Sequence, residues 1–165
     1  MVTYFKQAYL EIATFIFRAL DTIKLDEIEK FVKTIEEIYR ANKKILVVGV
    51  GRSGLVGRAF AMRLRHLGAR SYVVGETITP SVEEGDLLVA ISGSGSTQIV
   101  VAAAEAAKRM KSKVAAITTY YDSPLGTLFE DTSMVVLDAV VAELMKRLGK
   151  NESELARRHA NIEVP

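Results

Sequence analysis

Four short runs of β-branched and aliphatic residues alternate with helical segments, and this alternation limits the fold more than any other feature of the sequence. Strands that alternate with helices are joined by right-handed crossovers and form a parallel sheet. We therefore expect an α/β domain built as a three-layer αβα sandwich. The expected strands are residues 44–50, 70–74, 87–91 and 113–118, with helices near residues 53–67 and 97–110.

Two amphipathic helices are expected before the first strand. In each of them apolar residues recur at three- and four-residue steps, which places them on one face of a helix. We expect both stripes to pack in the core, with the alternative that the aromatic-rich first helix packs on another subunit. The stripes are Ala8, Ile12, Phe15, Ile16 and Ala19 in the first helix, and Leu25, Ile28, Val32, Ile35 and Tyr39 in the second.

The last part of the chain predicts a long helix over residues 127–148, which stops at Gly149. Asn151 can cap a short helix after it, because its side chain can accept a bond from a free helix amide. With 165 residues, 49% of them apolar, the chain fits one globular domain, residues 1–165.

Charge and composition narrow the classes of partner and chemistry. The 22 basic and 20 acidic residues leave a net charge of +2, too small and too evenly spread for a nucleic-acid or membrane-surface binder. With no Cys and two His, no disulfide framework, zinc-thiolate site or other metal site is expected. No apolar run is long enough to span a membrane, and Lys6 and Glu11 interrupt any signal-peptide core, so we expect a cytoplasmic protein.

The first strand leads through a glycine-rich turn into a helix. Gly49, Gly51 and Gly54 give the pattern G-x-G-x-x-G, in which backbone amides and a helix N-terminus approach a phosphate. This pattern is also typical of nicotinamide-dependent enzymes. Glu76, just past the second strand, would then be the candidate ribose acceptor.

The third strand ends in a second small-residue loop, Ser92-Gly93-Ser94-Gly95-Ser96-Thr97, which again opens a helix. Hydroxyls, glycines and free helix amides make a cradle for one phosphate dianion, and a dinucleotide site does not require it. Carboxyl ends of parallel strands are also where α/β sheets bind ligands. Neither loop ends in the Gly-Lys-Ser/Thr of a nucleotide P-loop, which argues against an ATPase.

These residues resemble the sugar isomerase (SIS) family, whose S-x-S-G-x-T loop matches Ser92, Ser94, Gly95 and Thr97. Further similarity points to the 6-phospho-3-hexuloisomerases within that family and covers almost the whole chain. It is carried by residues 48–54, 60–64, 75–80, 126–130 and 158–161.

The resemblance implies a flavodoxin-like SIS fold and the interconversion of D-arabino-3-hexulose 6-phosphate and fructose 6-phosphate through a cis-enediol. It also implies the ribulose monophosphate pathway, no cofactor and a homotetramer. A catalytically silent phosphosugar sensor is the alternative from another functional class. Members usually have a fifth strand and a loop where Leu125 here meets Gly126 directly. Either this protein has lost that strand or the sequence omits a segment. A real deletion would leave a four-stranded sheet and a site that lacks one wall.

The implied isomerisation needs a phosphate anchor, a base and an acid. The anchor would be the loop Ser92, Gly93, Ser94, Gly95, Ser96 and Thr97, while Gly51, Arg52 and Ser53 would bind the sugar hydroxyls or the phosphate edge.

Three acidic residues of the last long helix are candidates for the base: Glu130, Asp138 and Glu143. A helix that follows a parallel strand begins beside the ligand, and Glu143 lies about 20 Å farther along the helix than Glu130 at 1.5 Å per residue. We therefore predict Glu130 as the base. Asp138, within an apolar run, could instead be a buried structural acceptor.

His159 is the candidate acid, because histidine titrates near neutral pH. The resemblance suggests that it reaches the pocket of a neighbouring subunit. His66 lies between Leu64 and Leu67 on a helix and is expected to be a packed core residue.

Overall fold

The computed structural model describes residues 3–119 and 127–159. Its elements, in chain order, are α1 (Thr3–Ala19), α2 (Leu25–Arg40), β1 (Lys44–Gly49), α3 (Arg52–Leu67), β2 (Arg70–Val73), β3 (Leu87–Ile91), α4 (Gln98–Arg109), β4 (Lys113–Ile117), α5 (Thr127–Arg147) and α6 (Glu152–Ala156). The predicted strands and helices are confirmed, and their ends differ from the prediction by one residue at most places. Residues 120–126, where we expected the shortened connection, and residues 160–165 lie outside the described part of the chain.

The described strands form a four-stranded parallel sheet in the order β2-β1-β3-β4. β1 and β3 occupy the centre, and their buried aliphatic residues explain why both read as continuous apolar runs. Since all four strands run the same way, the loops after β1 and β3 leave the sheet at the same edge.

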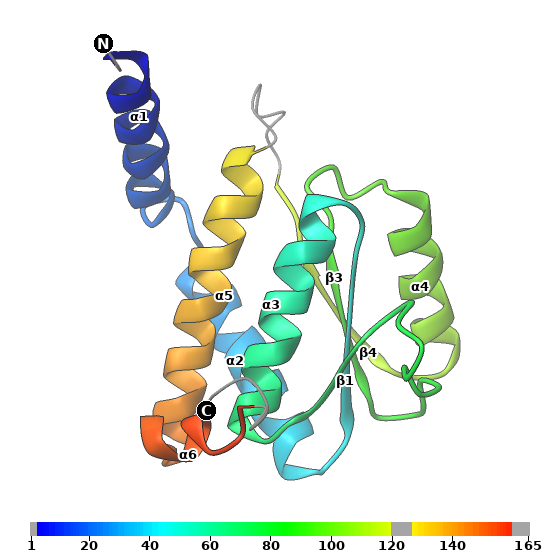
Figure 1. The fold of residues 1–165 in the computed structure, drawn as a ribbon. Coiled ribbons are helices and arrows are strands. Elements are labelled where there is room, and N and C mark those ends of the chain that lie inside the picture. The colour runs from blue at the N-terminus through cyan, green and yellow to red at the C-terminus, as the bar shows by residue number, and fades with distance from the viewer. Residues whose placement is uncertain (1–2, 120–126, 160–165) are drawn as a thin grey trace.

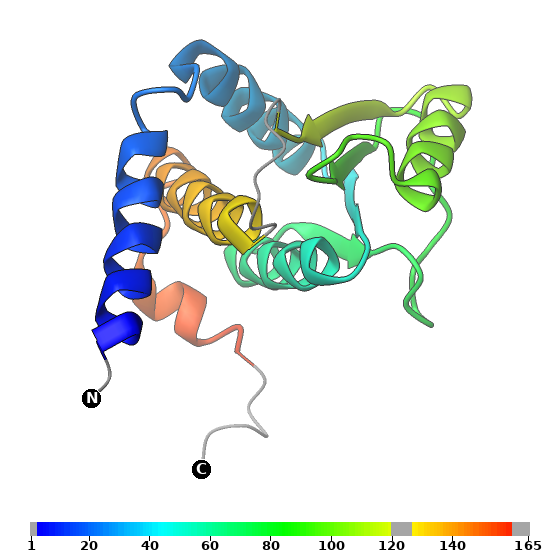
Figure 2. The same cartoon turned by 90° about the horizontal axis from the view of Figure 1, so that it is seen from above.

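Helices cover both faces of the sheet, which confirms the three-layer α/β sandwich (Figure 1). α4 covers one face, and α2, α3 and α5 lie on the other (Figure 2). The larger core cluster joins Ile45 and Val89 of the sheet to Ile35, Leu64 and Leu144 of those three helices. The cluster on the α4 face is smaller and is centred on Leu46, Leu88 and Val100.

α1 stands at the outside of the molecule and packs along α5 rather than against the sheet (Figures 1 and 2). Its predicted stripe faces α5 only in part: Phe15 is exposed and the other stripe residues are half-buried. The expectation that α1 packs in the core is therefore wrong within one chain. Its aromatic residues add to the exposed apolar surface, Tyr4 and Phe17 being 81% and 77% exposed.

The second helix is confirmed as a core helix with one exception. Val32 and Ile35 are buried, whereas Leu25 lies in the first turn and is largely exposed. Helix ends also follow the sequence: Gly68 ends α3 with a left-handed backbone, and Asn151 forms a capping box with Glu154 at α6. Within the described ranges, no helix has the length and apolar character needed to cross a bilayer.

Candidate functional site

The turn from β1 into α3 is compact because two glycines lie against each other. A Cβ added to Gly49 would lie 2.6 Å from the backbone oxygen of Ser53, and one added to Gly54 would lie 2.9 Å from the Gly49 oxygen. Gly51 precedes the helix with a φ of +60°, a conformation that suits glycine. Among the described residues no side chain caps α3, and its first turn has no acidic residue. The free amides and positive dipole end of α3 therefore face the sheet edge.

The loop after β3 presents its polar groups at the same edge. The hydroxyls of Ser92 and Thr97 lie 3.0 Å apart, and Ser94 Oγ accepts bonds from the backbone amide and the hydroxyl of Ser96. Thr97 precedes α4 without capping it, and the first turn of α4 again has no acidic residue. The loop thus combines the exposed hydroxyls of Ser94 and Ser96 with the N-terminus of α4, which is the arrangement expected of an anion site, while Ser92 is buried.

The first turn of α5 joins the two loops. Gly93 of the second loop packs against the ring of Phe129, since an added Cβ would lie 3.1 Å from Phe129 Cδ1. The next residue, Glu130, accepts a hydrogen bond of 3.0 Å from the Ser53 hydroxyl of the first loop. Both loops therefore contact the first turn of α5, the first through Glu130 and the second through Phe129.

The two carboxylate oxygens of Glu130 have different surroundings. Oε1 accepts the bond from Ser53, whose side chain is buried. Oε2 lies 3.5 Å from Arg52 Nη2 and is buried, with no hydrogen-bond partner among the described residues. The Glu130 side chain is 15% exposed and that of Arg52 is 55% exposed, so the guanidinium lies on the solvent side of the carboxylate.

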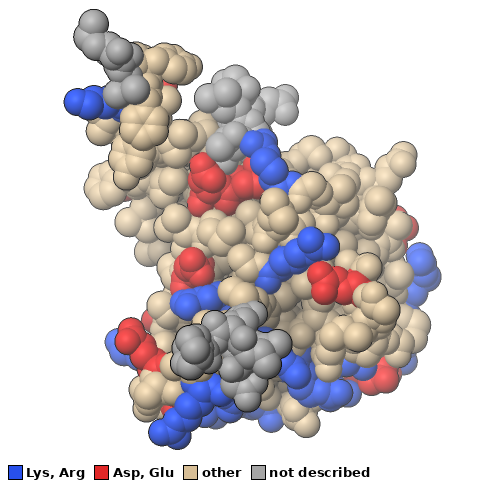
Figure 3. Space-filling view, in the orientation of Figure 1, with Lys and Arg blue, Asp and Glu red and all other residues tan. Residues whose placement is uncertain are grey.

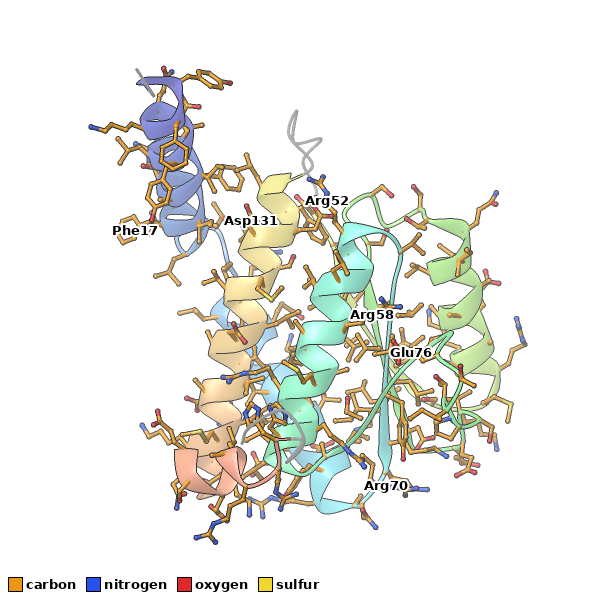
Figure 4. All side chains as sticks on the ribbon, in the orientation of Figure 1. Phe17, Arg52, Arg58, Arg70, Glu76 and Asp131 are labelled. Carbon is orange, nitrogen blue, oxygen red and sulfur yellow. The ribbon has the colours of Figure 1, made fainter. Side chains whose placement is uncertain are left out.

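Figure 4 shows Arg52 at the end of α3 beside the amino end of α5, where Asp131 also lies. In the space-filling view, acidic and basic side chains adjoin at this end of the molecule (Figure 3). The site is therefore a mixed-charge edge and not a uniformly basic patch, which fits a small ligand better than a polyanion.

The other two carboxylates considered for the base lie elsewhere on α5. Asp138 is 54% exposed and pairs with Arg63, which corrects the expectation of a buried acceptor. Glu143 pairs with Arg147 near the far end of the helix. Of the three, Glu130 is the one that contacts the first loop.

His159 does not lie near Glu130 in the same chain. Its ring lies 3.9 Å from that of His66, centroid to centroid, near the C-terminal end of α3, while Glu130 contacts Ser53 at the N-terminal end. Those ends are about 20 Å apart at 1.5 Å per residue. His66 is 8% exposed, which confirms the expectation of a packed residue. The residues beyond His159 that carry the resemblance, 160 and 161, lie outside the described part of the chain.

Two contributors to the site were not singled out in the sequence. Phe129 packs on Gly93, and Thr118, just past β4, donates a hydrogen bond of 3.3 Å to the Gly93 oxygen. The signal for Thr118 was the position of its strand, because β4 is the neighbour of β3 and ends at the same edge. Phe129 had no such signal, since an aromatic residue beside an acidic one is common at the start of a helix.

Glu76, the candidate ribose acceptor, forms an ion pair of 3.1 Å with Arg58. The pair lines a groove of about 330 Å³ between α3 and the segment after β2. Across the two described ranges, no three His, Asp or Glu residues come close enough together to hold a metal ion.

Comparison with known proteins gives a consistent set of matches. A family model described as the SIS domain matches residues 37–141. A 3-hexulose-6-phosphate isomerase of Methanocaldococcus jannaschii is 46% identical, with 78% of this chain and 81% of that protein covered. A solved structure of a hypothetical protein from Methanococcus jannaschii, for which a molecular function of 3-hexulose-6-phosphate isomerase is inferred, has a TM-score of 0.80 at 39% identity. It is matched over 92% of this chain and 96% of that chain.

A relative from Aeropyrum pernix, described as uncharacterized, is 48% identical over 191 positions, with 93% of this chain and 90% of the relative covered. The aligned length exceeds the 165 residues of this chain. That relative therefore has residues with no counterpart here.

Proposed function

The chain belongs to the SIS domain family, and we propose that it is a phosphosugar isomerase that interconverts D-arabino-3-hexulose 6-phosphate and fructose 6-phosphate. The single observation that carries the proposal is the position of Glu130. Glu130 accepts a bond from the first loop, while its neighbour Phe129 packs against the second, and each loop leads into a helix whose N-cap residue makes no side-chain cap bond. A base beside a phosphate-binding edge is what a carbonyl shift within a sugar phosphate requires.

In the proposed reaction the loop Ser92–Thr97 and the α4 amides hold the phosphate. Glu130 takes the proton from C2 of the 3-hexulose, the C–H electron pair forms the C2=C3 bond, and the C3 oxygen takes up a proton. The cis-enediol then loses the proton of its C2 oxygen as C3 receives one, which leaves the carbonyl at C2. No oxidant or reductant enters, because the two sugars are isomers. Fixed geometry between anchor and base accounts for much of the acceleration in such a reaction.

Replacement of Glu130 tests the proposal. We expect Glu130→Gln to lose turnover by a factor of about 100 to 10,000, the usual contribution of a general base. Its binding of fructose 6-phosphate is expected to remain. Turnover is followed by ¹³C NMR of the sugar, and binding by calorimetry. The matched variants are Asp138→Asn and Glu143→Gln on the same helix, and loss of turnover in either of them with an active Glu130→Gln would move the base.

Ser94→Ala tests the anchor in the same assays. The Ser94 hydroxyl is exposed and lies in the loop that ends at α4. A hydrogen bond to a charged group contributes about 1.5–3 kcal/mol, so we expect binding to weaken by about tenfold or more. Unchanged binding would place the phosphate elsewhere.

A second function, phosphosugar binding without catalysis, is favoured by one observation. The relative aligned over 191 positions has residues that this chain lacks. If they form a wall of the site in that relative, their loss here would remove turnover and leave binding. Wild-type protein that binds fructose 6-phosphate and yields no 3-keto product in the ¹³C spectrum would establish this second function in place of the first.

The proposed enzyme is a homotetramer in which α1 contributes to an interface between subunits. The support is the exposed aromatic surface of α1, together with its position at the outside of the molecule (Figure 1). Assembly would also offer a route for His159 to act as the acid in a neighbouring site, since it is remote from Glu130 within one chain. The proposed metabolic role is in the ribulose monophosphate pathway.

A further inference from the structure

The Arg52–Glu130 pair has a geometry that a purely structural ion pair would not need. Nη2 and Oε2 are 3.5 Å apart, longer than the 2.7–3.2 Å of a nitrogen-to-oxygen hydrogen bond. Although Oε2 is buried, it accepts no hydrogen bond from residues 3–119 or 127–159. Oε1, in contrast, is fixed by Ser53. Within the described part of the chain, one oxygen of the carboxylate is thus held by a hydrogen bond and the other lies in an ion pair with Arg52.

Arg52 is placed to serve a second partner. It is the first residue of α3 and is 55% exposed, at the uncapped helix end where an anion is favoured. A planar guanidinium binds phosphate and hydroxyl oxygens at full hydrogen-bond distance, which it does not reach at Oε2. A sugar phosphate entering this edge therefore competes with Glu130 for the same side chain.

We propose that Arg52 is shared between Glu130 and the substrate: it covers Oε2 in the free protein and moves to the oxygens of the sugar phosphate when that binds. This inference rests on the proposed function. The transfer leaves Oε2 as the oxygen that accepts the proton, while Ser53 keeps the carboxylate in place through Oε1. Arg52 therefore binds the substrate in the occupied site and pairs with the Glu130 carboxylate in the empty site.

The competition predicts an unusual result for binding. If Glu130 and the ligand share Arg52, then removing the charge of Glu130 should tighten ligand binding. The probe is glucitol 6-phosphate, which has no carbonyl and cannot be isomerised. From the range measured for partly exposed ion pairs, we expect Glu130→Gln to lower its Kd by about two- to fivefold in calorimetry.

A double-mutant cycle separates this effect from simple relief of charge repulsion. In the Arg52→Gln background, Glu130→Gln changes the charge near the ligand but cannot release Arg52. The proposal requires the tightening to be at least twofold larger when Arg52 is present. Equal tightening in both backgrounds, or weaker binding in Glu130→Gln alone, overturns the shared-residue inference.

Steady-state kinetics give a second readout. We expect Arg52→Gln to raise KM at least tenfold and to lower kcat much less, because Glu130 no longer contacts Arg52 in the bound state. A fixed role for Arg52 in orienting Glu130 would lower kcat at unchanged KM. Arg52→Lys should recover part of the KM effect.

The matched control is Arg58→Gln. Arg58 lies on the same helix, its side chain is 61% exposed, and it pairs with the exposed carboxylate of Glu76. The substitution should leave Kd and KM unchanged within twofold. Wild-type protein that fails to bind glucitol 6-phosphate would refute the proposed function itself, whereas binding without coupling between Arg52 and Glu130 would refute the present inference alone.

Discussion

Gly49→Ala tests whether close backbone packing in the β1–α3 turn positions the site. The added Cβ would lie 2.6, 2.8 and 2.9 Å from the Ser53 oxygen, the Ser53 carbon and the Gly54 nitrogen. These distances are roughly 1 Å shorter than the 3.5–4.0 Å at which such atoms pack. All three atoms belong to the backbone, so no side chain can rotate away, and the first turn of α3 must move.

The cost follows from this displacement. Overpacking that shifts the backbone destabilises a protein by about 1–3 kcal/mol, which corresponds to roughly 2–4 °C in Tm for each kcal/mol in a chain of this size. The effect on catalysis should be larger, because the same turn carries the Ser53 hydroxyl that holds Glu130. A misplacement of about 1 Å can lower a rate by about 100-fold.

The assay compares Tm by circular dichroism and kcat with fructose 6-phosphate for the wild type, Gly49→Ala and Gly75→Ala. Gly75 is the control because a Cβ added there would have none of the described atoms within 4 Å, while its φ of +93°, which Gly49 does not share, strains an alanine. It should lose stability through backbone strain alone and keep its kcat. A Gly49→Ala protein with wild-type Tm and wild-type kcat would refute the argument that this contact sets the geometry of the site.

Two further predictions concern stability and assembly. Arg147, with help from Lys33, lowers the pKa of Glu29 from its ordinary 4.5 to about 2 through hydrogen bonds between α2 and α5, so this pair stabilises the fold above pH 4.5 and the stabilisation is lost as the pH falls toward 2. Glu29→Gln should therefore lose less Tm than the wild type between pH 4.5 and 2, and an equal loss of Tm in both proteins would contradict this. Because Glu29 is 42% exposed, added salt should reduce the difference in Tm between the two proteins. For assembly, Phe17 is 77% exposed on α1, and Phe17→Asp should lower the mass measured by sedimentation; an unchanged mass would remove α1 from the proposed interface.

The local elements could be predicted because their signals are local. A strand buried on both faces is a run such as Ile45-Leu46-Val47-Val48, and a helix is a stripe with a period near 3.6 residues, so both are visible within a few positions. The shared edge also followed, since parallel strands direct the loops after β1 and β3 the same way. Glu130 was preferred over Asp138 and Glu143 on the same ground, because the first turn of a helix lies near the end of the strand before it.

Other features depended on how the helices pack, which periodicity does not encode. The sequence assigned Ser53 to the substrate, whereas in the structure its buried hydroxyl bonds Glu130, 77 residues later. Likewise, the sequence marked an apolar stripe on α1 without revealing that the helix would pack along α5.

The sequence by itself determined the order of strands and helices and the chemistry at the end of each central strand, since hydrophobic period and turn residues act over short distances. Only the tertiary structure decided that Oε1 of Glu130 bonds Ser53 and that Oε2 lies beside Arg52. It also placed His159 at the far end of α3. Those outcomes are set by ångström-scale contacts between residues remote in the chain, and such contacts exist only once the layers have packed.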